Sequence, residues 1–371
     1  MLSKATIRNF RSFSGELIFD LETKKHYEFN DFAIKDTTIN HSIIYGKNGC
    51  GKSNLGLAIL DVVSNLNTDE VVHINSLKDS YLNADSKEDL AEFSFKFKFG
   101  KNIVTYDYGK RQVDSPIYET LKINERVVIS VDRRKSNTAT FLLAGSEGLK
   151  TDLSNSSISV VRYLDFNTIL DENEENSVFN EFVDFVKSMV FFRTLSRGPE
   201  YYGSRIDVKR LSAEIIVNNK VKDFESFLNE AGVDCSLCVT GEGEDKVIEF
   251  DFQHDRIEFS KIASTGTYSL GISYYWWLKL NAGHYKFAFI DEFDAFYHYD
   301  LSKLIVKMLN TLDCQTVLTT HNVTLLSNDL LRPDCYFEMK DARIIPFNEL
   351  VDKDLRRAHN LEKIYKGVHS G

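Results

Sequence analysis

One short segment restricts the fold of this chain more than any other, namely Gly46-Lys-Asn-Gly-Cys-Gly51-Lys52-Ser53. It has the form G-x-x-x-x-G-K-[ST], follows an apolar run at 41–45 and precedes apolar residues with helical spacing at 55–66. Its glycines allow successive backbone N–H groups to turn toward one anion, and a helix N-terminus adds partial positive charge. The segment therefore predicts a strand–loop–helix unit that binds phosphate.

A pair of carboxylates complements this loop. Asp291 and Glu292 directly follow the apolar run 287–290, which predicts a buried strand. Open parallel sheets bind ligands at the carboxyl ends of their strands. Lys52 would contact the β- and γ-phosphates, and Ser53 and Asp291 would hold Mg²⁺. Glu292 would polarise a water molecule for attack on the γ-phosphate. Together the two segments predict hydrolysis of a nucleoside triphosphate.

Two further polar segments have both an ordinary and a functional interpretation. His321 ends an apolar strand and lies 30 residues after Asp291 (321 − 291), so it is placed to donate a hydrogen bond to a γ-phosphate. Taken alone, it is an ordinary histidine at a strand end. Ser264 and Gly266 begin a helix and offer a second anion cradle, although alone they indicate only an N-cap. Because one nucleotide cannot easily use both cradles of a monomer, we expect a two-fold dimer.

Composition limits the classes of function. The net charge is −10, from 45 Lys and Arg against 55 Asp and Glu, which argues against nucleic-acid binding through overall charge. Basic residues at 133–135 and 193–210 are interpreted as solvated surface, with contact to nucleic acid as the alternative. No apolar run approaches the roughly 20 residues of a membrane span, and the first residues do not resemble a signal peptide. The odd count of five cysteines predicts a reducing, cytoplasmic location.

The periodicity predicts an α/β chain organised in three parts. Residues 1–131 contain the phosphate loop and a set of strands in which Phe93, Phe95, Phe97 and Phe99 share one face. Residues 132–261 have helical stripes at 179–190 and 221–231 and predict an inserted, mainly helical lobe. Residues 262–371 return to strands that alternate with helices, which implies a largely parallel sheet.

These motifs, in this order, resemble the soluble ABC-type ATPases of the RecF, SMC and OLD-like branch. The segment 7–13, Ile-Arg-Asn-Phe-Arg-Ser-Phe, is similar to the opening strand of that branch, and 46–53 to its Walker A loop. Ser264-Thr-Gly266 resembles a degenerate signature motif, and Asp291-Glu292 resembles Walker B. Residues 293–298 resemble the D-loop, and His321 the switch histidine. The resemblance covers about residues 1–131 and 262–345.

The resemblance implies a P-loop ABC-ATPase sheet with an N-terminal antiparallel β-subdomain and the inserted helical lobe. It implies Glu292 and His321 as catalytic residues and ATP with Mg²⁺ as cofactors. Of the three glutamines in the chain, only Gln112 is a candidate for the family's Q-loop position, and the signature lacks its second glycine and its glutamine. The expected ligands of the nucleotide and metal are Arg11, Gly46, Asn48, Gly49, Gly51, Lys52, Ser53, Asn54, Ser264, Gly266, Asp291 and Asp294.

The biological role expected from the resemblance is gating of a separately encoded effector, a nuclease or toxin, in bacterial anti-phage defence. We expect a homodimer or higher homo-oligomer and no membrane partner. Only 26 residues follow Ile345 (371 − 345), which is too few for a TOPRIM nuclease domain. A RecF-like repair ATPase that acts on DNA is the alternative, and a non-hydrolysing scaffold is a third that Glu292 argues against.

Overall fold

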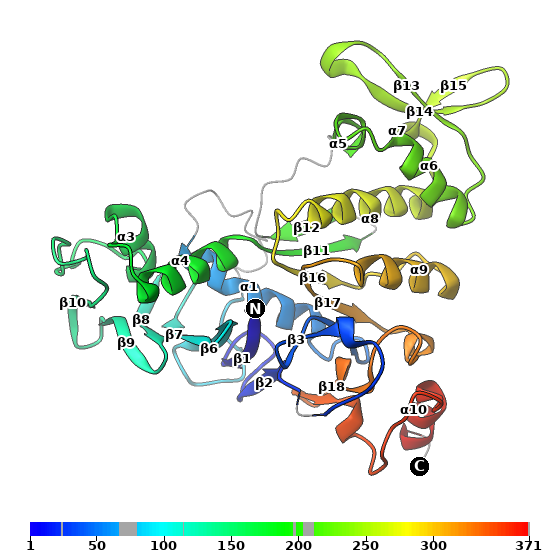
Figure 1. Cartoon of the computed structure of the whole chain (residues 1–371). Helices are drawn as coiled ribbons and strands as arrows, with labels where there is room; N and C mark the ends of the chain where they lie inside the picture. Colours follow the sequence, from blue (N-terminus) through cyan, green and yellow to red (C-terminus); the bar gives the residue numbers. More distant parts are fainter. Residues whose placement is uncertain (24, 67–79, 114, 196–197, 203–210, 370–371) are drawn as a thin grey trace.

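Two seven-stranded sheets organise the part of the chain that the structure describes (Figure 1). The computed structural model describes residues 1–23, 25–66, 80–113, 115–195, 198–202 and 211–369. A two-stranded ribbon of β3 (Ile34–Lys35) and β4 (Thr38–Ile39) and a separate three-stranded sheet complete the described strands. Among the described helices, none is both long and apolar enough to cross a membrane.

The first sheet is antiparallel throughout, and its strands between residues 91 and 141 follow one another as hairpins. Alternate aromatic residues of one strand, Phe93, Phe95, Phe97 and Phe99, are buried as predicted. Phe97 and Phe99 pack against helix α4 (Glu174–Lys187), where the ring centres of Phe97 and Phe182 lie 5.2 Å apart. The strand order is β10 (Ser136–Phe141), β9 (Arg126–Asp132), β8 (Pro116–Ile123), β7 (Asn102–Lys110), β6 (Ala91–Phe99), β1 (Leu2–Arg8) and β2 (Leu17–Asp20).

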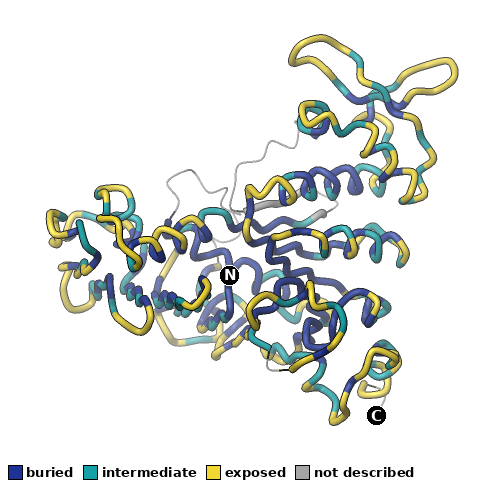
Figure 2. Tube along the Cα trace, in the orientation of Figure 1, coloured by how far each residue is buried: buried dark blue, intermediate teal, exposed yellow. Residues whose placement is uncertain are grey.

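The second sheet is parallel except at its two edges, and this confirms the expected α/β fold. Every residue of its three central strands is buried (Figure 2). Because they run in one direction, their carboxyl ends meet at one edge of the sheet. The order is β12 (Gly198–Tyr202), β11 (Met189–Leu195), β16 (Phe287–Asp291), β17 (Gln315–Thr320), β5 (His41–Tyr45), β18 (Tyr336–Lys340) and β19 (Arg343–Pro346).

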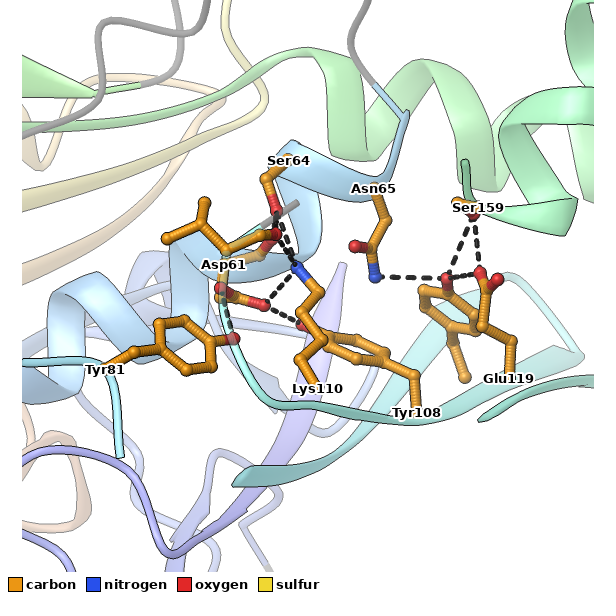
Figure 3. Close-up of polar contacts among 10 residues, drawn as sticks. Asp61, Ser64, Asn65, Tyr81, Tyr108, Lys110, Glu119 and Ser159 are labelled. Atoms are coloured by element: carbon orange, nitrogen blue, oxygen red, sulfur yellow. Dashed lines mark hydrogen bonds and ion pairs between the residues drawn. The ribbon is translucent and has the colours of Figure 1, made fainter. Parts of the chain in front are cut away.

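Helix α1 (Lys52–Leu66) connects the two sheets, and most of its residues are buried. Gly56 permits a close approach to the parallel sheet, because a Cβ there would lie 2.6 Å from Phe289 of β16 and 2.8 Å from Phe191 of β11. Farther along α1, Asp61 and Ser64 bind Lys110 of β7 in the antiparallel sheet (Figure 3). Contacts with both sheets therefore fix the helix that begins at the phosphate loop.

The remaining helices flank this framework. Helix α8 (Thr265–Asn281) packs against α9 (Tyr299–Leu309), and its Trp276 stacks on Phe192 of β11 with ring centres 4.3 Å apart. Helix α3 (Val160–Asn167) packs against α1 and β9, and α10 (Leu361–His369) lies near the C-terminus. The helices expected after the phosphate loop and around Asp291 are thus present.

The range 132–261 does not form one inserted, mainly helical lobe, and that expectation is corrected here. Strand β10 extends the antiparallel sheet, and β11 pairs in parallel with β16 inside the second sheet. Met189 and Val190, which continue the helical stripe in the sequence, are buried strand residues. Among the described residues of this range, 211–262 project from the two sheets as a mixed unit of α5 (Leu211–Val217), α6 (Val221–Glu230), β13 (Leu237–Thr240), β14 (Val247–Asp251), β15 (Arg256–Glu258) and α7 (Phe259–Ile262) (Figure 1).

Candidate functional site

The phosphate loop lies between β5 and α1, at the carboxyl edge of the parallel sheet. Gly49 and Gly51 have φ angles of 78° and 106°, a backbone region that side chains with a Cβ rarely adopt. A Cβ on Gly46 would lie 2.5 Å from the Cys50 sulfur, and one on Gly51 would lie 2.8 Å from Phe13. The sequence therefore folds here into a loop whose shape depends on its glycines.

Lys52 begins α1 and directs its ammonium group back over the loop. Its Nζ donates to the Gly46 carbonyl at 2.8 Å and lies 3.3 Å from Nε2 of His321. Burial lowers the pKa of Lys52, and the proximity of Cys50, Asp291 and Glu292 opposes that shift. The positive charge is thus held beside the histidine and the two carboxylates that the sequence predicted as its neighbours.

Asp291 ends β16 and is fully buried. Its Oδ1 accepts a hydrogen bond from Thr319 at 2.7 Å, whereas Oδ2 has no hydrogen-bond partner among the described residues. Burial raises the pKa of Asp291, and the hydroxyls of Ser53 and Thr319 oppose the rise. A buried, unsatisfied carboxylate oxygen beside a serine hydroxyl is a donor set that fits Mg²⁺, because this ion prefers oxygen ligands.

Glu292 follows with a left-handed backbone conformation, φ 48°, which is uncommon for glutamate. Its amide donates to the Thr319 hydroxyl at 2.8 Å, so one threonine orients both acidic residues. The Glu292 Oε1 lies 3.7 Å from Nε2 of His321. Strained backbone of this kind occurs at functional sites more often than elsewhere.

A hollow of about 480 Å³ opens at this edge of the sheet. Asp294 lines it and is half-buried; its Oδ2 accepts from Thr320 at 2.8 Å, and burial raises its pKa. The residues that line the hollow are Asn48, Glu292, Asp294, Ala295, Tyr297, His321 and Asn322. The hollow therefore joins the phosphate loop to the segment that follows β16 and to the end of β17.

Arg11 and Asn54 form a second polar contact beside the loop. The Arg11 Nε donates to Asn54 Oδ1 at 2.9 Å, and Asn54 Nδ2 donates to Ser12 at 2.8 Å. Burial lowers the pKa of Arg11, with a further contribution from the nearby guanidinium of Arg193. The opening segment 7–13 is thereby attached to the first turn of α1.

Ser264 and Gly266 stand at the start of α8 and do not line this hollow. Ser264 caps α8, because its hydroxyl accepts from the Thr267 amide at 3.2 Å. Ser264 lines a different hollow, of about 620 Å³, together with Thr267, Asp234 and Phe252. The structure thus brings together the predicted residues of the loop, Asp291, Glu292, Asp294 and His321, and leaves Ser264 outside that group.

Sequence reasoning placed Arg193 among the basic residues at 193–210 and missed its position beside Asp291. Strand β11 pairs with β16 in a register that sets Arg193 opposite Asp291, and Arg193 Nη1 lies 3.8 Å from Asp291 Oδ2. The signal was present, since Met189-Val-Phe-Phe-Arg193 is an apolar run that ends in a charge, like Phe287-Ala-Phe-Ile-Asp291. Gln112, the Q-loop candidate, lies instead between β7 and β8 of the antiparallel sheet.

Among solved structures, the chain is similar to the SMC head domain from Thermotoga maritima, at 14% identity and a TM-score of 0.43, covering 93% of this chain and 98% of that one. It is also similar to an Smc head domain with an extended coiled coil, bound to the C-terminal domain of ScpA, derived from Pyrococcus furiosus, at 13% identity and a TM-score of 0.44; this covers 100% and 98% of the two chains. No curated protein matches.

A family model covers most of the chain. The model described as "AAA domain, putative AbiEii toxin, Type IV TA system" matches residues 42–327, a range that includes the phosphate loop, the strand before Asp291 and His321. This match agrees with the ATPase-type α/β fold that the sequence predicted. The chain belongs to this AAA_21 family.

Proposed function

We propose that this protein binds and hydrolyses ATP together with Mg²⁺. One observation carries the proposal: Lys52, Glu292 and His321 lie close together at the edge of the parallel sheet where the glycine loop follows β5. Glu292 and His321 directly follow β16 and β17, which are neighbouring parallel strands, and Lys52 is the first residue of the helix after the loop. Phosphoryl transfer depends on a phosphate cradle, a cation and a group that orients the attacking water, and His321 adds a hydrogen-bond donor to this set.

Each residue has a role in this proposal. The loop amides and Lys52 hold the phosphates, and Ser53 and Asp291 hold the metal, which when bound neutralises charge on the transferring phosphoryl group. Thr319 orients Asp291 and Glu292 through its hydroxyl. Glu292 polarises the attacking water, and His321 donates to the γ-phosphate.

The substitution Glu292→Gln tests the hydrolytic part. It keeps the size of the side chain and removes its basic carboxylate, so we expect ATP turnover to fall by about 100-fold or more while ATP still binds. Turnover is measured by phosphate release, and binding by titration with a fluorescent ATP analogue. Unchanged turnover in this variant would remove Glu292 from its role, and loss of binding would indicate a structural defect.

We further propose that two copies enclose the nucleotides, with Ser264 and Gly266 of one copy completing the site of the other. The separate location of Ser264 supports this arrangement, because it leaves a second helix start away from the hollow beside Lys52. The variants Lys52→Ala and Ser264→Ala should each lose turnover, and a mixture of the two should regain part of it through hybrid dimers. A mixture as inactive as its components would contradict shared sites.

The biological role that we propose is gating of a separately encoded effector in anti-phage defence. The family description, which names a toxin of a toxin–antitoxin system, supports this role. Purification with the products of flanking genes, with and without ATP, tests it, and the expected result is an ATP-dependent complex. Turnover stimulated by DNA in the absence of such a complex would favour the RecF-like alternative.

A further inference from the structure

Arg193 occupies a position that the proposed mechanism does not use. It lies on β11, on the side of β16 opposite to β17 and His321, and its side chain is 23% exposed. Its Nη1 approaches Asp291 Oδ2 to 3.8 Å, which is an ion-pair distance and longer than a hydrogen bond. This oxygen is also the one that accepts no hydrogen bond among the described residues.

The electrostatics of this arrangement favour an ion pair between Arg193 and Asp291 in which another cation can replace the guanidinium. A fully buried carboxylate requires a counter-charge, and a partner at 3.8 Å supplies attraction without the directional bonds of a close pair. The same oxygen is the one expected to face a metal ion. A guanidinium and a divalent cation on one oxygen repel each other, so the two cannot share Asp291 Oδ2 closely.

We propose that Arg193 is the resident counter-ion of Asp291, that Mg²⁺ replaces it when MgATP binds, and that the displaced guanidinium then contacts the phosphates. This inference rests on the proposed ATPase function. Guanidinium groups prefer carboxylate and phosphate as acceptors, so both states give Arg193 a suitable partner at the same edge of the sheet. Arg193 thus couples metal entry to phosphate contact.

The substitution Arg193→Met tests the proposal, because it keeps an extended side chain and removes the charge. We expect two opposite effects. Without the competing cation, Mn²⁺ alone should bind to the protein several-fold more tightly, as measured by the loss of the free Mn²⁺ signal in electron paramagnetic resonance. The kcat for ATP should fall by about tenfold or more, because a phosphate contact is lost. Arg193→Lys should retain the competition and lose part of kcat.

The matched control is Arg256→Met, which removes an arginine paired with Asp251 at 3.0 Å on the exposed β15 hairpin. It should change neither Mn²⁺ affinity nor kcat. Equal Mn²⁺ affinity of the wild type and Arg193→Met, including no binding by either, would overturn the inference whatever kcat does. Absence of ATP turnover in the wild type would contradict the proposed function instead, and the Mn²⁺ comparison would still decide the role of Arg193.

Discussion

Two aspartates of this protein are similarly buried but differ in how far their carboxylate oxygens are hydrogen-bonded. Asp61 of α1 has both carboxylate oxygens bonded, Oδ1 to Lys110 at 2.8 Å and to Tyr108 at 2.9 Å, and Oδ2 to Tyr81 at 2.8 Å (Figure 3). Asp291 of β16 has one oxygen bonded to Thr319 and the other without a hydrogen bond among the described residues.

The difference separates a structural group from a ligand-binding group. Buried polar atoms in folded proteins are nearly always hydrogen-bonded, so a fully bonded carboxylate needs nothing further to be stable. The Asp61 cluster joins α1 to the antiparallel sheet, and its satisfied bonds serve the fold. An unsatisfied buried oxygen lowers stability, and its presence at a cradle of glycines indicates a site that a ligand completes.

The largest loss of stability is expected from removing the cation that is bonded to Asp61. Lys110→Met removes the only cation bonded to Asp61 in Figure 3 and leaves a buried charge whose remaining donors are tyrosine hydroxyls. We expect the free energy of unfolding to fall by about 3–5 kcal/mol, because uncompensated buried charges are strongly destabilising. Denaturant unfolding measures the change.

A surface lysine provides the control for that experiment. Lys101 is 80% exposed and pairs with Glu174 at 3.0 Å, and Lys101→Met should change stability by about 1 kcal/mol or less. If both lysine variants lose similarly little stability, the Asp61 cluster has no special structural role.

The substitution Asp291→Asn should raise stability, whereas Lys110→Met should lower it. The amide keeps an acceptor for Thr319 and cannot hold a metal through charge, so we expect ATP turnover to fall by about 100-fold or more. The free energy of unfolding should rise at neutral pH, because burial raises the pKa of Asp291 and the charged form therefore disfavours folding. Phosphate release and denaturant unfolding measure the two effects.

The pH dependence of stability tests whether the buried charge of Asp291 is the cause of the gain expected for Asp291→Asn. With its pKa raised in the folded state, Asp291 binds a proton more readily there than in the unfolded chain, so it lowers stability increasingly as pH rises. The stability gain of Asp291→Asn should therefore shrink as pH approaches about 4, near the ordinary pKa of aspartate. A gain that is independent of pH would mean that charge burial is not its cause.

Much of this architecture could be predicted from the sequence because its signals are local. The loop 46–53, the apolar runs that became β5, β16 and β17, and the alternating phenylalanines of β6 each depend on neighbouring residues alone. Asp291, Glu292 and His321 were predicted to meet because consecutive parallel strands end at one edge of a sheet, and the structure brings them together.

What could not be predicted depends on pairing between distant segments. The likeness between the apolar runs before Arg193 and Asp291 does not by itself show that β11 lies beside β16. The residues before Arg193 fit a helix as well as a strand, so the sequence pattern assigns the range 132–261 to one lobe. For the same reason, the sequence does not predict the ion pair between Asp61 and Lys110, which are 49 residues apart (110 − 61) in different elements.

The smallest change in stability is expected from Gly56→Ala. This substitution lies in α1, the helix that begins at Lys52 and carries Asp61. Alanine favours helices over glycine by about 1 kcal/mol, but this Cβ would lie 2.6 Å from Phe289 of β16, and such overpacking costs about 1–3 kcal/mol. We expect a net loss of stability together with weaker ATP binding, measured by unfolding and by titration. Gly367→Ala in α10, where nothing lies within 4 Å of the new Cβ, should be stabilising instead. If Gly56→Ala weakened ATP binding without lowering stability, the phosphate site would depend on the position of α1 more sharply than the fold does.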